Sequence, residues 1–587
     1  MTKKNAWLGG LIIAAVVLIT YQPALTIGFI GDDWMLYHRA GTMSLGDYAQ
    51  SYLNPLAQTY WYRPMQGLQY WVGYALFRGN AVGYHAINLL AHLANCGLIF
   101  ALVARISQRA RVALIAALIF ATLTGYGWAA LWISDSAPFE TFFALSALWF
   151  WWRYLHQRRR QDAGLTLGAV ALALLTRESA APLPLVLFLL DRLVARQPAD
   201  WRTLTRRYAG LAILLGAFFL IEWNIRQHAS ADYGIHAGYV LGAHTLDNLI
   251  RYLAHLAFPW DLPTPWNYVW LALVAGALGI WIVVRRDQTL AFVVLAGLLG
   301  FCVFVPFGLF NVRYLYAALI AFAVLLAGGI DHVLRWRRGL VVLAAFALTA
   351  LVVGDAFAVS EKASGLADLS RYNRTLLRGV TQLRSNFPPD TYLYFIYPSA
   401  STVDLTGMFF WRLGAQLEVS GTDRFRLAAL RAHQNTWVYF TDEQDTLREQ
   451  AVARTINARP APALPADWGA IALQEIELVN DRVRRGEALV LIAHWLARAP
   501  LDRDYTVFAH VVDAQGRIVA SVDRQPQNGA MPTSAWRVGR LLPDGIVIPL
   551  DAEIAPGTYA IQVGMYYLPT MERLAEPVTL APVFVSE

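Results

Sequence analysis

Asp32 and Asp33 form an adjacent pair of carboxylates directly after the first long apolar run of the chain. A carboxylate at such a position can act as a general base, which removes a proton from an attacking hydroxyl. It can also cap the short helix predicted over "WMLYHRA", because an Asp side chain satisfies the free backbone N–H groups of a helix start. Neighbouring side chains diverge on a turn. We therefore expect one Asp to be the cap and the other to be the base.

Three arginines, Arg63, Arg177 and Arg313, stand at the ends of other apolar runs, on connections that are otherwise poor in basic residues. A guanidinium donates two parallel hydrogen bonds and so suits a pair of phosphate oxygens. The alternative is that each Arg snorkels to lipid headgroups. The segment "WISDSAPFE" offers Asp135 and Glu140 as a second acid. The candidate binding surface is completed by the neighbours Tyr62, Glu178 and Tyr314.

The segment "GYHAINLLAHLAN" places His85, Asn88, His92 and Asn95 on one stripe of a helix. The two histidines are separated by about 10 Å along a helix that rises 1.5 Å per residue, so we do not expect them to share a metal ion. Hydrogen bonds between helices are the expected role of His92 and Asn95. His85 and Asn88 lie nearer the outer end of the helix and can line a site.

The composition is that of a membrane protein. Of 587 residues, 57% are hydrophobic and 15% are charged, whereas about a quarter of a soluble protein is charged. The start "MTKKNAWLGG" could belong to a signal peptide, but no small-x-small cleavage site follows and further apolar runs do, so we expect a retained helix. Cys96 and Cys302 both lie in apolar runs, which leaves no disulfide framework or cysteine metal cluster. No strong metal motif is visible, and we expect no cofactor.

Eleven apolar runs predict about eleven membrane helices. They lie near 7–27, 83–104, 112–131, 139–152, 163–175, 181–194, 208–222, 265–284, 288–310, 313–330 and 338–358. Alternate connections are basic, as in "RISQRAR", "RYLHQRRRQ" and "RWRR", and the positive-inside rule places these in the cytoplasm. The net charge of +7 therefore reflects topology, and we expect no nucleic-acid partner. The N-terminus is expected inside, and everything after residue 359 outside the plasma membrane.

The sequence pattern changes after residue 359. Short β-rich runs such as "TYLYFIYP", "TWVYFTD", "ALVLIAHWLA" and "GTYAIQVGMYY" alternate with turn signals such as "AQG" and "APG". We expect an all-β sandwich over 466–587. The segment 360–465 mixes helical and strand patterns and predicts a small α/β module, with "RPAPALPAD" (459–467) as the linker. The membrane domain is expected to span 1–359.

Four segments together carry a resemblance to a known superfamily. They are "DDW", "YWYRPMQGLQYWVGYALFRGNAVGYHAINLLAHLAN", "LLTRESAAPLPLVLFLLD" and "VRYLYAALIAF". They resemble the GT-C superfamily of polytopic glycosyltransferases (family 39-like), in the branch of protein O-mannosyltransferases and bacterial lipid A aminoarabinose transferases. The resemblance covers roughly residues 1–330. It implies an acidic pair in the first external loop whose leading Asp, here Asp32, is catalytic, with Asp33 in second place.

The resemblance also implies the chemistry. The donor would be a sugar on a polyprenyl phosphate, of the hexosyl or mannosyl type, transferred with inversion at the outer face to a protein, lipid or glycan acceptor. Where relatives read "GR-x-D" ahead of the fourth helix, this chain reads "SDSAPFE", so the second acid is open between Asp135 and Glu140. In its composition, the predicted C-terminal sandwich is similar to appended carbohydrate-binding-like modules.

Two other classes of function compete with the glycosyltransferase. A transporter or flippase of lipid-linked sugars would use the arginines to bind phosphate in transit, but the paired inverted repeats common in transporters are not found. An envelope receptor could bind glycan through the sandwich and use the helices as an anchor. About eleven helices and an acidic pair exceed what an anchor needs.

Overall fold

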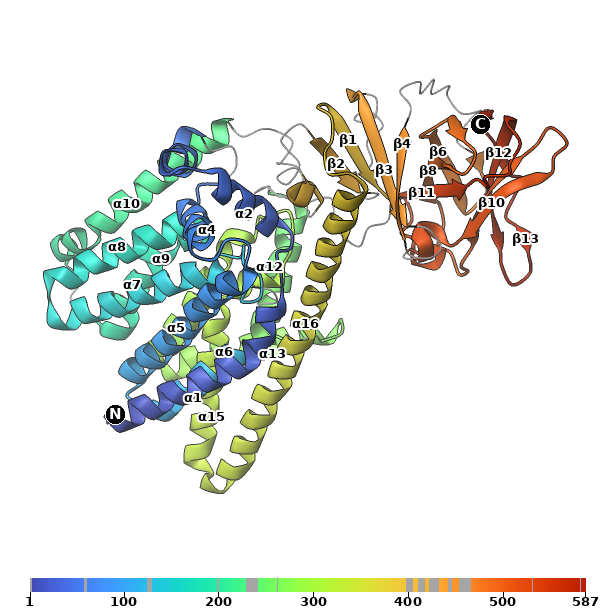
Figure 1. The fold of residues 1–587 in the computed structure, drawn as a ribbon. Coiled ribbons are helices and arrows are strands. Elements are labelled where there is room, and N and C mark those ends of the chain that lie inside the picture. The colour runs from blue at the N-terminus through green and yellow to red at the C-terminus, as the bar shows by residue number, and fades with distance from the viewer. Residues whose placement is uncertain are drawn as a thin grey trace. The chain divides into compact units, whose positions relative to one another are not determined.

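The computed structural model describes residues 3–57, 61–123, 129–197, 200–228, 241–260, 262–396, 405–409, 417–421, 432–441, 446–452, 466–529, 531–580 and 582–587. The chain forms two compact units. The helical unit consists of Met1–Phe29 and Leu36–Ser370, and the C-terminal unit consists of Ile30–Met35 and Arg371–Glu587. Figure 1 shows that helices make up the first unit and strands most of the second.

The helical unit contains long helices joined by short connections. In chain order the helices are α1 (Lys3–Tyr21), α2 (Asp32–Thr42), α3 (Leu45–Tyr48), α4 (Pro64–Phe77), α5 (Ala81–Ser107), α6 (Ala110–Thr122), α7 (Ala137–Gln157), α8 (Arg160–Thr176), α9 (Leu183–Leu189), α10 (Trp201–His228), α12 (Ala243–Ala257), α13 (Trp266–Arg285), α14 (Gln288–Leu299), α15 (Leu319–Trp336) and α16 (Val341–Leu383). The start of α2 belongs to the C-terminal unit, as does the end of α16.

Each of the eleven predicted apolar runs overlaps a helix, although the runs near 112–131 and 288–310 extend well beyond the ends of α6 and α14. Among the described residues, six helical segments are long and apolar enough to cross a membrane: 7–26, 81–107, 201–227, 266–285, 319–336 and 341–383. This confirms a multi-pass helical membrane protein, while the count of eleven spans stays a prediction. Helices α4 and α12 were not among the predicted runs. Pro64 starts α4, which suits the first turn of a helix because Pro has no N–H to leave unpaired.

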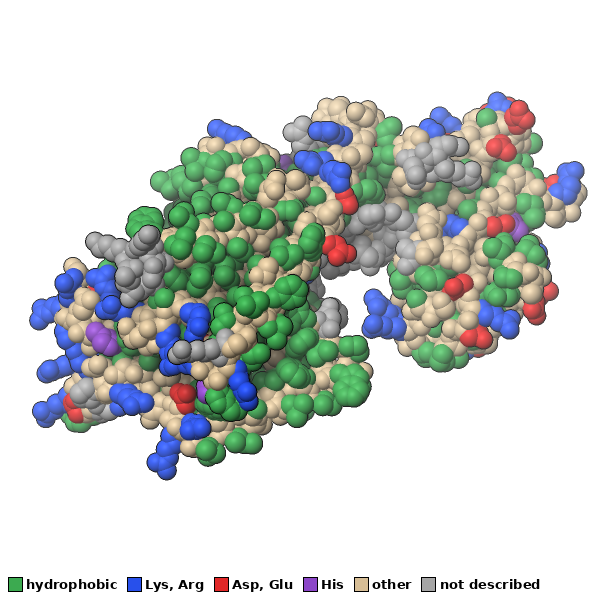
Figure 2. All heavy atoms as spheres, turned by 90° about the horizontal axis from the view of Figure 1, so that it is seen from below, with side chains coloured by type: hydrophobic (Ala, Val, Ile, Leu, Met, Phe, Trp, Pro, Cys, Tyr) green, Lys and Arg blue, Asp and Glu red, His purple; other side chains and the backbone are tan. Residues whose placement is uncertain are grey.

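Small side chains bring the central helices close together. Ala113, Ala116, Ala117 and Ala121 of α6 are all fully buried, and α6 packs against α1, α5 and α15. Small residues favour helix association in a bilayer because they let backbones approach. No residue of α13 is buried, so its apolar surface is available to lipid. Figure 2 shows a broad hydrophobic surface over the helical unit, with Lys and Arg side chains gathered toward one end.

Regular helix stops at three places that matter for function. The segment 129–136 precedes α7, the 3₁₀ turn Glu178–Ala180 separates α8 from α9, and the 3₁₀ turn Val312–Leu315 precedes α15. Helix α8 ends because Arg177 adopts an extended backbone, with φ −162° and ψ 141°. At each of these points, backbone N–H and C=O groups and polar side chains therefore lie outside the regular α-helical hydrogen-bond pattern.

The C-terminal unit contains strands in the order β2–β1–β3–β4, and two further sheets in the orders β10–β9–β12–β15–β7 and β11–β8–β6–β5. The strands are β1 (Thr391–Phe395), β2 (Leu417–Gly421), β3 (Asn435–Thr441), β4 (Leu447–Val452), β5 (Ala466–Asp467), β6 (Ile471–Leu478), β7 (Arg482–Arg484), β8 (Ala488–Ala497), β9 (Thr506–Val512), β10 (Ile518–Arg524), β11 (Leu541–Pro549), β12 (Gly557–Tyr567), β13 (Glu572–Arg573), β14 (Val578–Thr579) and β15 (Val583–Ser586).

The two later sheets share one core. Leu491, Trp495 and Ile548 from one sheet and Val511 and Ile561 from the other belong to a single buried cluster. Such a face-to-face arrangement is a β-sandwich, as the strand pattern predicts. The outer face of its β8 strand packs Val490 and Ile492 against Tyr392 and Tyr394 of β1, so the α/β sheet and the sandwich are continuous.

The predicted domain boundaries at 359 and 465 stay predictions. Helix α16 continues through position 359, where the sequence turns from apolar to polar. Most of the expected linker, residues 459–465, lies outside the described residues, and only Ala466 and Asp467 of it are seen, in β5. Independent folding of 466–587 would expose the apolar contact made by Val490 and Ile492.

Candidate functional site

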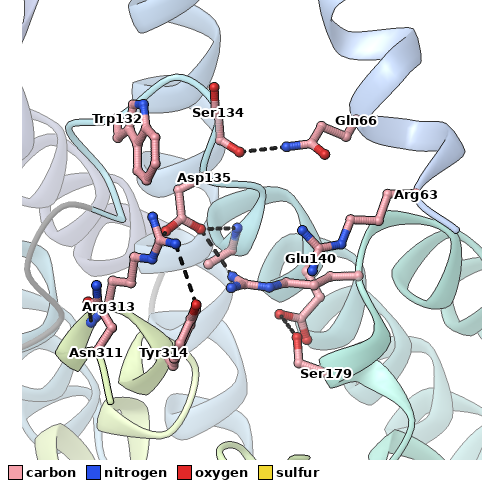
Figure 3. A network of polar contacts seen from close by, with 12 residues as sticks. Arg63, Gln66, Trp132, Ser134, Asp135, Glu140, Ser179, Asn311, Arg313 and Tyr314 are labelled. Atoms are coloured by element: carbon pink, nitrogen blue, oxygen red, sulfur yellow. Dashed lines mark hydrogen bonds and ion pairs between the residues drawn. The ribbon is translucent and has the colours of Figure 1, made fainter. Parts of the chain in front are cut away.

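Asp135 lies at the centre of a buried polar cluster in the helical unit, which we call the Asp135 cluster. Its Oδ1 accepts a hydrogen bond from Arg177 Nη1 at 3.1 Å, and its Oδ2 lies 3.8 Å from Arg313 Nε. The side chains of Asp135 and Arg177 are 2% and 6% exposed, whereas that of Arg313 is 22% exposed. Figure 3 shows the side chain of Arg313 directed toward Asp135. One carboxylate thus organises two guanidinium groups that come from distant parts of the chain.

The loop that carries Asp135 is held by side chains from neighbouring helices. Asn88 of α5 donates to the carbonyl of Trp132 at 3.0 Å, and Gln66 of α4 donates to the carbonyl of Ser134 at 2.7 Å (Figure 3). Asp135 Oδ1 also accepts the backbone N–H of Ala137 at 3.0 Å, at the start of α7. These bonds satisfy backbone groups that no helix pairs, and they limit the freedom of the Asp135 carboxylate.

Arg63 and Glu178 form a second ion pair beside this cluster. Arg63 Nε donates to Glu178 Oε2 at 2.9 Å and Nη2 donates to Oε1 at 2.6 Å. Burial of Glu178 opposes its ionisation, but the charge and hydrogen bonds of Arg63, followed by the charge of Arg177, outweigh it and lower the pKa of Glu178 to about 2. Glu178 is therefore a carboxylate near neutral pH. The bidentate geometry occupies the fork of Arg63 that the sequence reading assigned to phosphate.

Aromatic rings support the arginines of the Asp135 cluster. The guanidinium carbon of Arg177 lies 4.9 Å from the ring centre of Phe304, and that of Arg313 lies 4.6 Å from Trp132. Tyr314 stacks on Phe304 with ring centres 4.2 Å apart and its hydroxyl accepts a hydrogen bond from Arg313 at 3.4 Å. Cation–π contacts stabilise a cation that has lost part of its hydration. These contacts stabilise both guanidinium groups in their partly buried positions.

A cavity of about 730 Å³ adjoins the cluster within the helical unit. Most of its lining is aliphatic, including Leu145, Val186 and Ile320. Its polar lining includes Glu140 and Ser179, whose side chains make a hydrogen bond of 3.1 Å. Elsewhere the lining includes Arg109, Asp287 and His332. Ser179 follows Glu178 directly in the chain, so the polar cluster and the apolar cavity are adjacent. Such a combination suits a ligand with a charged head and a long hydrocarbon tail.

Asp32 and Asp33 belong to the C-terminal unit and Asp135 to the helical unit. The expectation that one Asp is an N-cap is wrong, because α2 begins at Asp32 and both acids lie in its first turn. Asp33 is fully buried and accepts the backbone N–H of Ile30 at 3.1 Å. The positive end of the helix dipole stabilises acidic side chains in the first turn. Asp32 remains partly exposed.

The remaining predicted site residues lie at different places in the helical unit. Tyr62 donates to the carbonyl of Leu53 at 3.1 Å, and Asn88 holds the loop before Asp135. His85 is buried in α5, and the described residues give it no link to the Asp135 cluster. Lower on the same helix, His92 and Asn95 both contact Tyr316 of the segment before α15, at 2.6 and 3.2 Å. His92 also bonds to the carbonyl of Ala121 in α6, and Asn95 donates to that of Pro138 in α7. These bonds confirm their predicted role between helices.

Several members of the site were missed from the sequence. Gln66, Trp132, Ser134 and Ser179 each contact a predicted residue or its loop. Helical spacing could have found Gln66, which lies one turn after Arg63, and chain adjacency could have found Ser134 and Ser179. The buried Glu222 of α10 interacts electrostatically with Glu178 and Arg63. Nothing in its apolar helix indicated that position beforehand.

One segment of the chain matches a known protein family. Residues 63–224 match the family model described as dolichyl-phosphate-mannose-protein mannosyltransferase. The resemblance to polytopic glycosyltransferases is confirmed. The matched segment contains Arg63, Asp135, Glu140 and Glu178 but neither Asp32 nor Arg313. No curated protein matches the chain.

Solved structures were also compared. The chain resembles ArnT from Cupriavidus metallidurans bound to undecaprenyl phosphate, at 14% identity and a TM-score of 0.46, over 74% of this chain and 93% of that chain. ArnT from Cupriavidus metallidurans in the apo state is 16% identical, with a TM-score of 0.47, over 76% of this chain and 94% of that chain. The arabinosyltransferase EmbB from Mycobacterium smegmatis is 12% identical, with a TM-score of 0.32, over 98% of this chain and 64% of that chain.

Proposed function

We propose that this protein is a glycosyltransferase that moves a sugar from a polyprenyl-phosphate donor to an acceptor hydroxyl at the outer face of the membrane. The observation that carries the proposal is the adjacency of the Asp135 cluster to the apolar cavity, through the Glu140–Ser179 pair. A polyprenyl phosphate has both parts that this arrangement suits. The family match of residues 63–224 supports the same class of reaction.

Arg313 is the proposed ligand of the donor phosphate. Its guanidinium is partly exposed, and its nearest carboxylate oxygen is 3.8 Å away, so it can turn toward a phosphate at little cost. Arg63 is engaged by both oxygens of Glu178, and Arg177 is almost fully buried on Asp135. We therefore revise the sequence reading, which gave Arg63 and Arg313 the same role. Arg63 and Arg177 act by positioning Glu178 and Asp135.

Asp32 is the proposed general base. Of the acidic pair it has the accessible side chain, whereas Asp33 is buried and bonded to the backbone. In the proposed step the acceptor hydroxyl gives its proton to the Asp32 carboxylate while its oxygen bonds to the anomeric carbon. The bond from that carbon to the phosphate oxygen breaks on the opposite face of the sugar, which gives inversion. Polyprenyl phosphate leaves with its negative charge facing Arg313.

Asp135 and Glu140 are the two candidates for a second acid. Asp135 already balances two arginines, so its proposed role is to orient them rather than to exchange a proton. Glu140 bonds to Ser179 at the rim of the cavity, where it would lie beside the donor headgroup. We keep it as the candidate for a second acid.

The test is donor turnover by the purified protein in lipid nanodiscs. A panel of polyprenyl-phosphate sugars is supplied with a mixture of acceptors, and release of free polyprenyl phosphate is followed by mass spectrometry. Release with at least one sugar, lost in Arg313→Ala and retained in Arg111→Ala, supports the proposal. Donor that binds to the wild-type protein but moves across the bilayer without release would favour a transporter instead.

The outer-face assignment has its own test. It depends on the basic connections, because these predict which ends of the helices face the cytoplasm. A cysteine introduced at the exposed Arg517 of the sandwich should react with a membrane-impermeant thiol reagent in intact cells. Protection of that position until the membrane is opened would place the C-terminal unit inside and overturn the assignment.

A further inference from the structure

Three side chains that metals commonly use as ligands gather on the sandwich of the C-terminal unit, far along the chain from the Asp135 cluster. They are Glu475 and Glu477 of β6 and His494 of β8. One ligand atom from each lies within 4.8 Å of the other two. In the strand register Glu475 is opposite His494, and Glu477 is opposite Ile492. Since residues opposite one another or two apart share a face, all three project from the same side of the sheet.

An irregularity in β6 creates this arrangement. Ile471 and Leu473 belong to the sandwich core, so simple alternation would place 475 and 477 in the core as well. The register shifts between Leu473 and Glu475, and Ile476 takes the core position instead. One extra residue therefore turns both glutamates onto the outer face. Bulges of this kind commonly re-aim side chains for a function.

Two of the three candidate ligand atoms lie close together without a hydrogen bond among the described residues. His494 Nε2 and Glu477 Oε2 are both buried from solvent, and neither makes a hydrogen bond among the described residues. They lie 4.0 Å apart, which is too long for a hydrogen bond. The Glu477 side chain is only 11% exposed. Two carboxylates this close repel one another, and a buried atom without a partner is costly. A cation between the three groups would remove both penalties.

We propose that Glu475, Glu477 and His494 bind a divalent transition-metal ion of the zinc type. One imidazole nitrogen and two carboxylate oxygens are suitable ligands for Zn²⁺, which binds at about 2.0–2.2 Å and takes four ligands. Ca²⁺ takes six to eight oxygens and is a poor fit to a site with a nitrogen. Small rotamer changes would bring the three atoms to bonding distance. The fourth position would hold water.

The ion would cross-link β6 and β8. His494 lies on the same face of β8 as Val490 and Ile492, which pack against the α/β sheet. A metal at this place would hold the two strands together beside that contact, and metal binding to the folded state stabilises it. The inference does not depend on the proposed transfer reaction, because it concerns other residues and is measured by binding.

The experiment uses the full-length protein in detergent, with any affinity tag removed and metal stripped by a chelator. Zn²⁺ is titrated calorimetrically, and Co²⁺ is titrated with visible absorption as a report on ligand geometry. We expect one Zn²⁺ per chain, a Co²⁺ spectrum of low coordination number, and a raised midpoint of thermal unfolding with Zn²⁺. Ca²⁺ should bind more than about tenfold more weakly.

Substitutions locate the ion. Glu475→Gln and His494→Gln should each weaken Zn²⁺ binding by more than about tenfold. His510→Gln is the matched control, because His510 also lies beside a carboxylate, Asp523, in the same sandwich, and it should retain binding. If His494→Gln fails to fold, Glu475→Gln decides, since Glu475 is exposed. No stoichiometric binding, or binding that survives Glu475→Gln, would overturn the proposal.

Discussion

Two clusters of aspartate and arginine in the helical unit use the same chemistry in different surroundings. Asp135 binds Arg177 and Arg313, whose side chains are 6% and 22% exposed. Asp331 of α15 binds Arg109, Arg111 and Arg335 at 3.2, 2.6 and 2.9 Å, and all three arginines are close to half exposed. Both carboxylates are buried. The difference lies in the arginines, whose charges solvent screens more strongly at Asp331 than at Asp135.

The two clusters also differ in the backbone that carries them. Arg111 and Arg335 lie on regular helices, and Arg335 reaches Asp331 from the next turn of the same helix. The Asp135 cluster instead comes from a loop, from the extended Arg177 and from a 3₁₀ turn. Exposed ion pairs on helices contribute little to stability, and they fit the basic connections predicted to face the cytoplasm. Buried pairs at helix breaks are costly to assemble, which favours a functional reason for the Asp135 cluster.

The largest expected effect concerns Asp32, the proposed general base. Asp32→Asn keeps the shape of the side chain but cannot accept a proton, so turnover should fall by about 10² or more while donor binding survives. Asp33→Asn should lose less, since an amide can still accept the Ile30 N–H. Turnover and donor affinity are measured in the same nanodisc preparation. An Asp32→Asn protein with normal turnover would end the catalytic assignment and favour transport or binding.

A smaller effect contrasts one arginine from each cluster. Arg313→Ala should weaken donor binding by about tenfold or more, because a charge-assisted contact to phosphate is lost. Lys at this position should restore part of the affinity, because it keeps the charge but not the planar fork. Arg335→Ala is the control and should change donor affinity by less than about twofold. Equal losses in Arg313→Ala and Arg335→Ala would remove the functional distinction between the clusters.

The pH dependence of stability should report the pair next to Asp135. The pKa of Glu178 falls from 4.5 to about 2 in the folded protein, so its contribution is complete above about pH 4.5 and is lost as the pH falls toward 2. The midpoint of thermal unfolding should therefore drop on acidification below pH 4.5. Glu178→Gln should be less stable at pH 7 and should lose less on acidification. Asp247→Asn, in an exposed pair with Arg251, should follow the wild type; a Glu178→Gln profile that also matched the wild type would contradict the assignment.

The smallest effect belongs to the Asp331 cluster. Arg111→Ala removes one of three half-exposed arginines, and Asp331 keeps the other two. The free energy of unfolding should fall by no more than about 1 kcal/mol, and turnover should not change. Chemical denaturation and the donor assay together measure this. A large loss of turnover would show that the cluster does more than hold helices together.

Much of the fold could be predicted from local patterns. The apolar runs marked the long helices, and short β-rich runs between turn signals marked β1, β3, β8 and β12. Strand β6 was missed because its bulge interrupts the alternation. Helix α4 was missed because it is short and carries Gln66 and Gln69 toward the loop before Asp135. In both cases the local sequence departs from the regular strand or helix pattern, because of a bulge in β6 and because of polar side chains in α4.

The sequence by itself determined that the chain must build membrane helices, because a long apolar run in lipid can satisfy its backbone only as a helix. It also indicated that the presence of Arg63, Arg177 and Arg313 near a bilayer needs a structural or functional explanation, because charges are costly there. Only the tertiary structure decided their partners. Arg177 meets Asp135 across 42 positions of the chain and Arg63 meets Glu178 across 115. No spacing rule reaches that far, because such pairs depend on how helices pack, and packing is set by the shapes of many side chains at once.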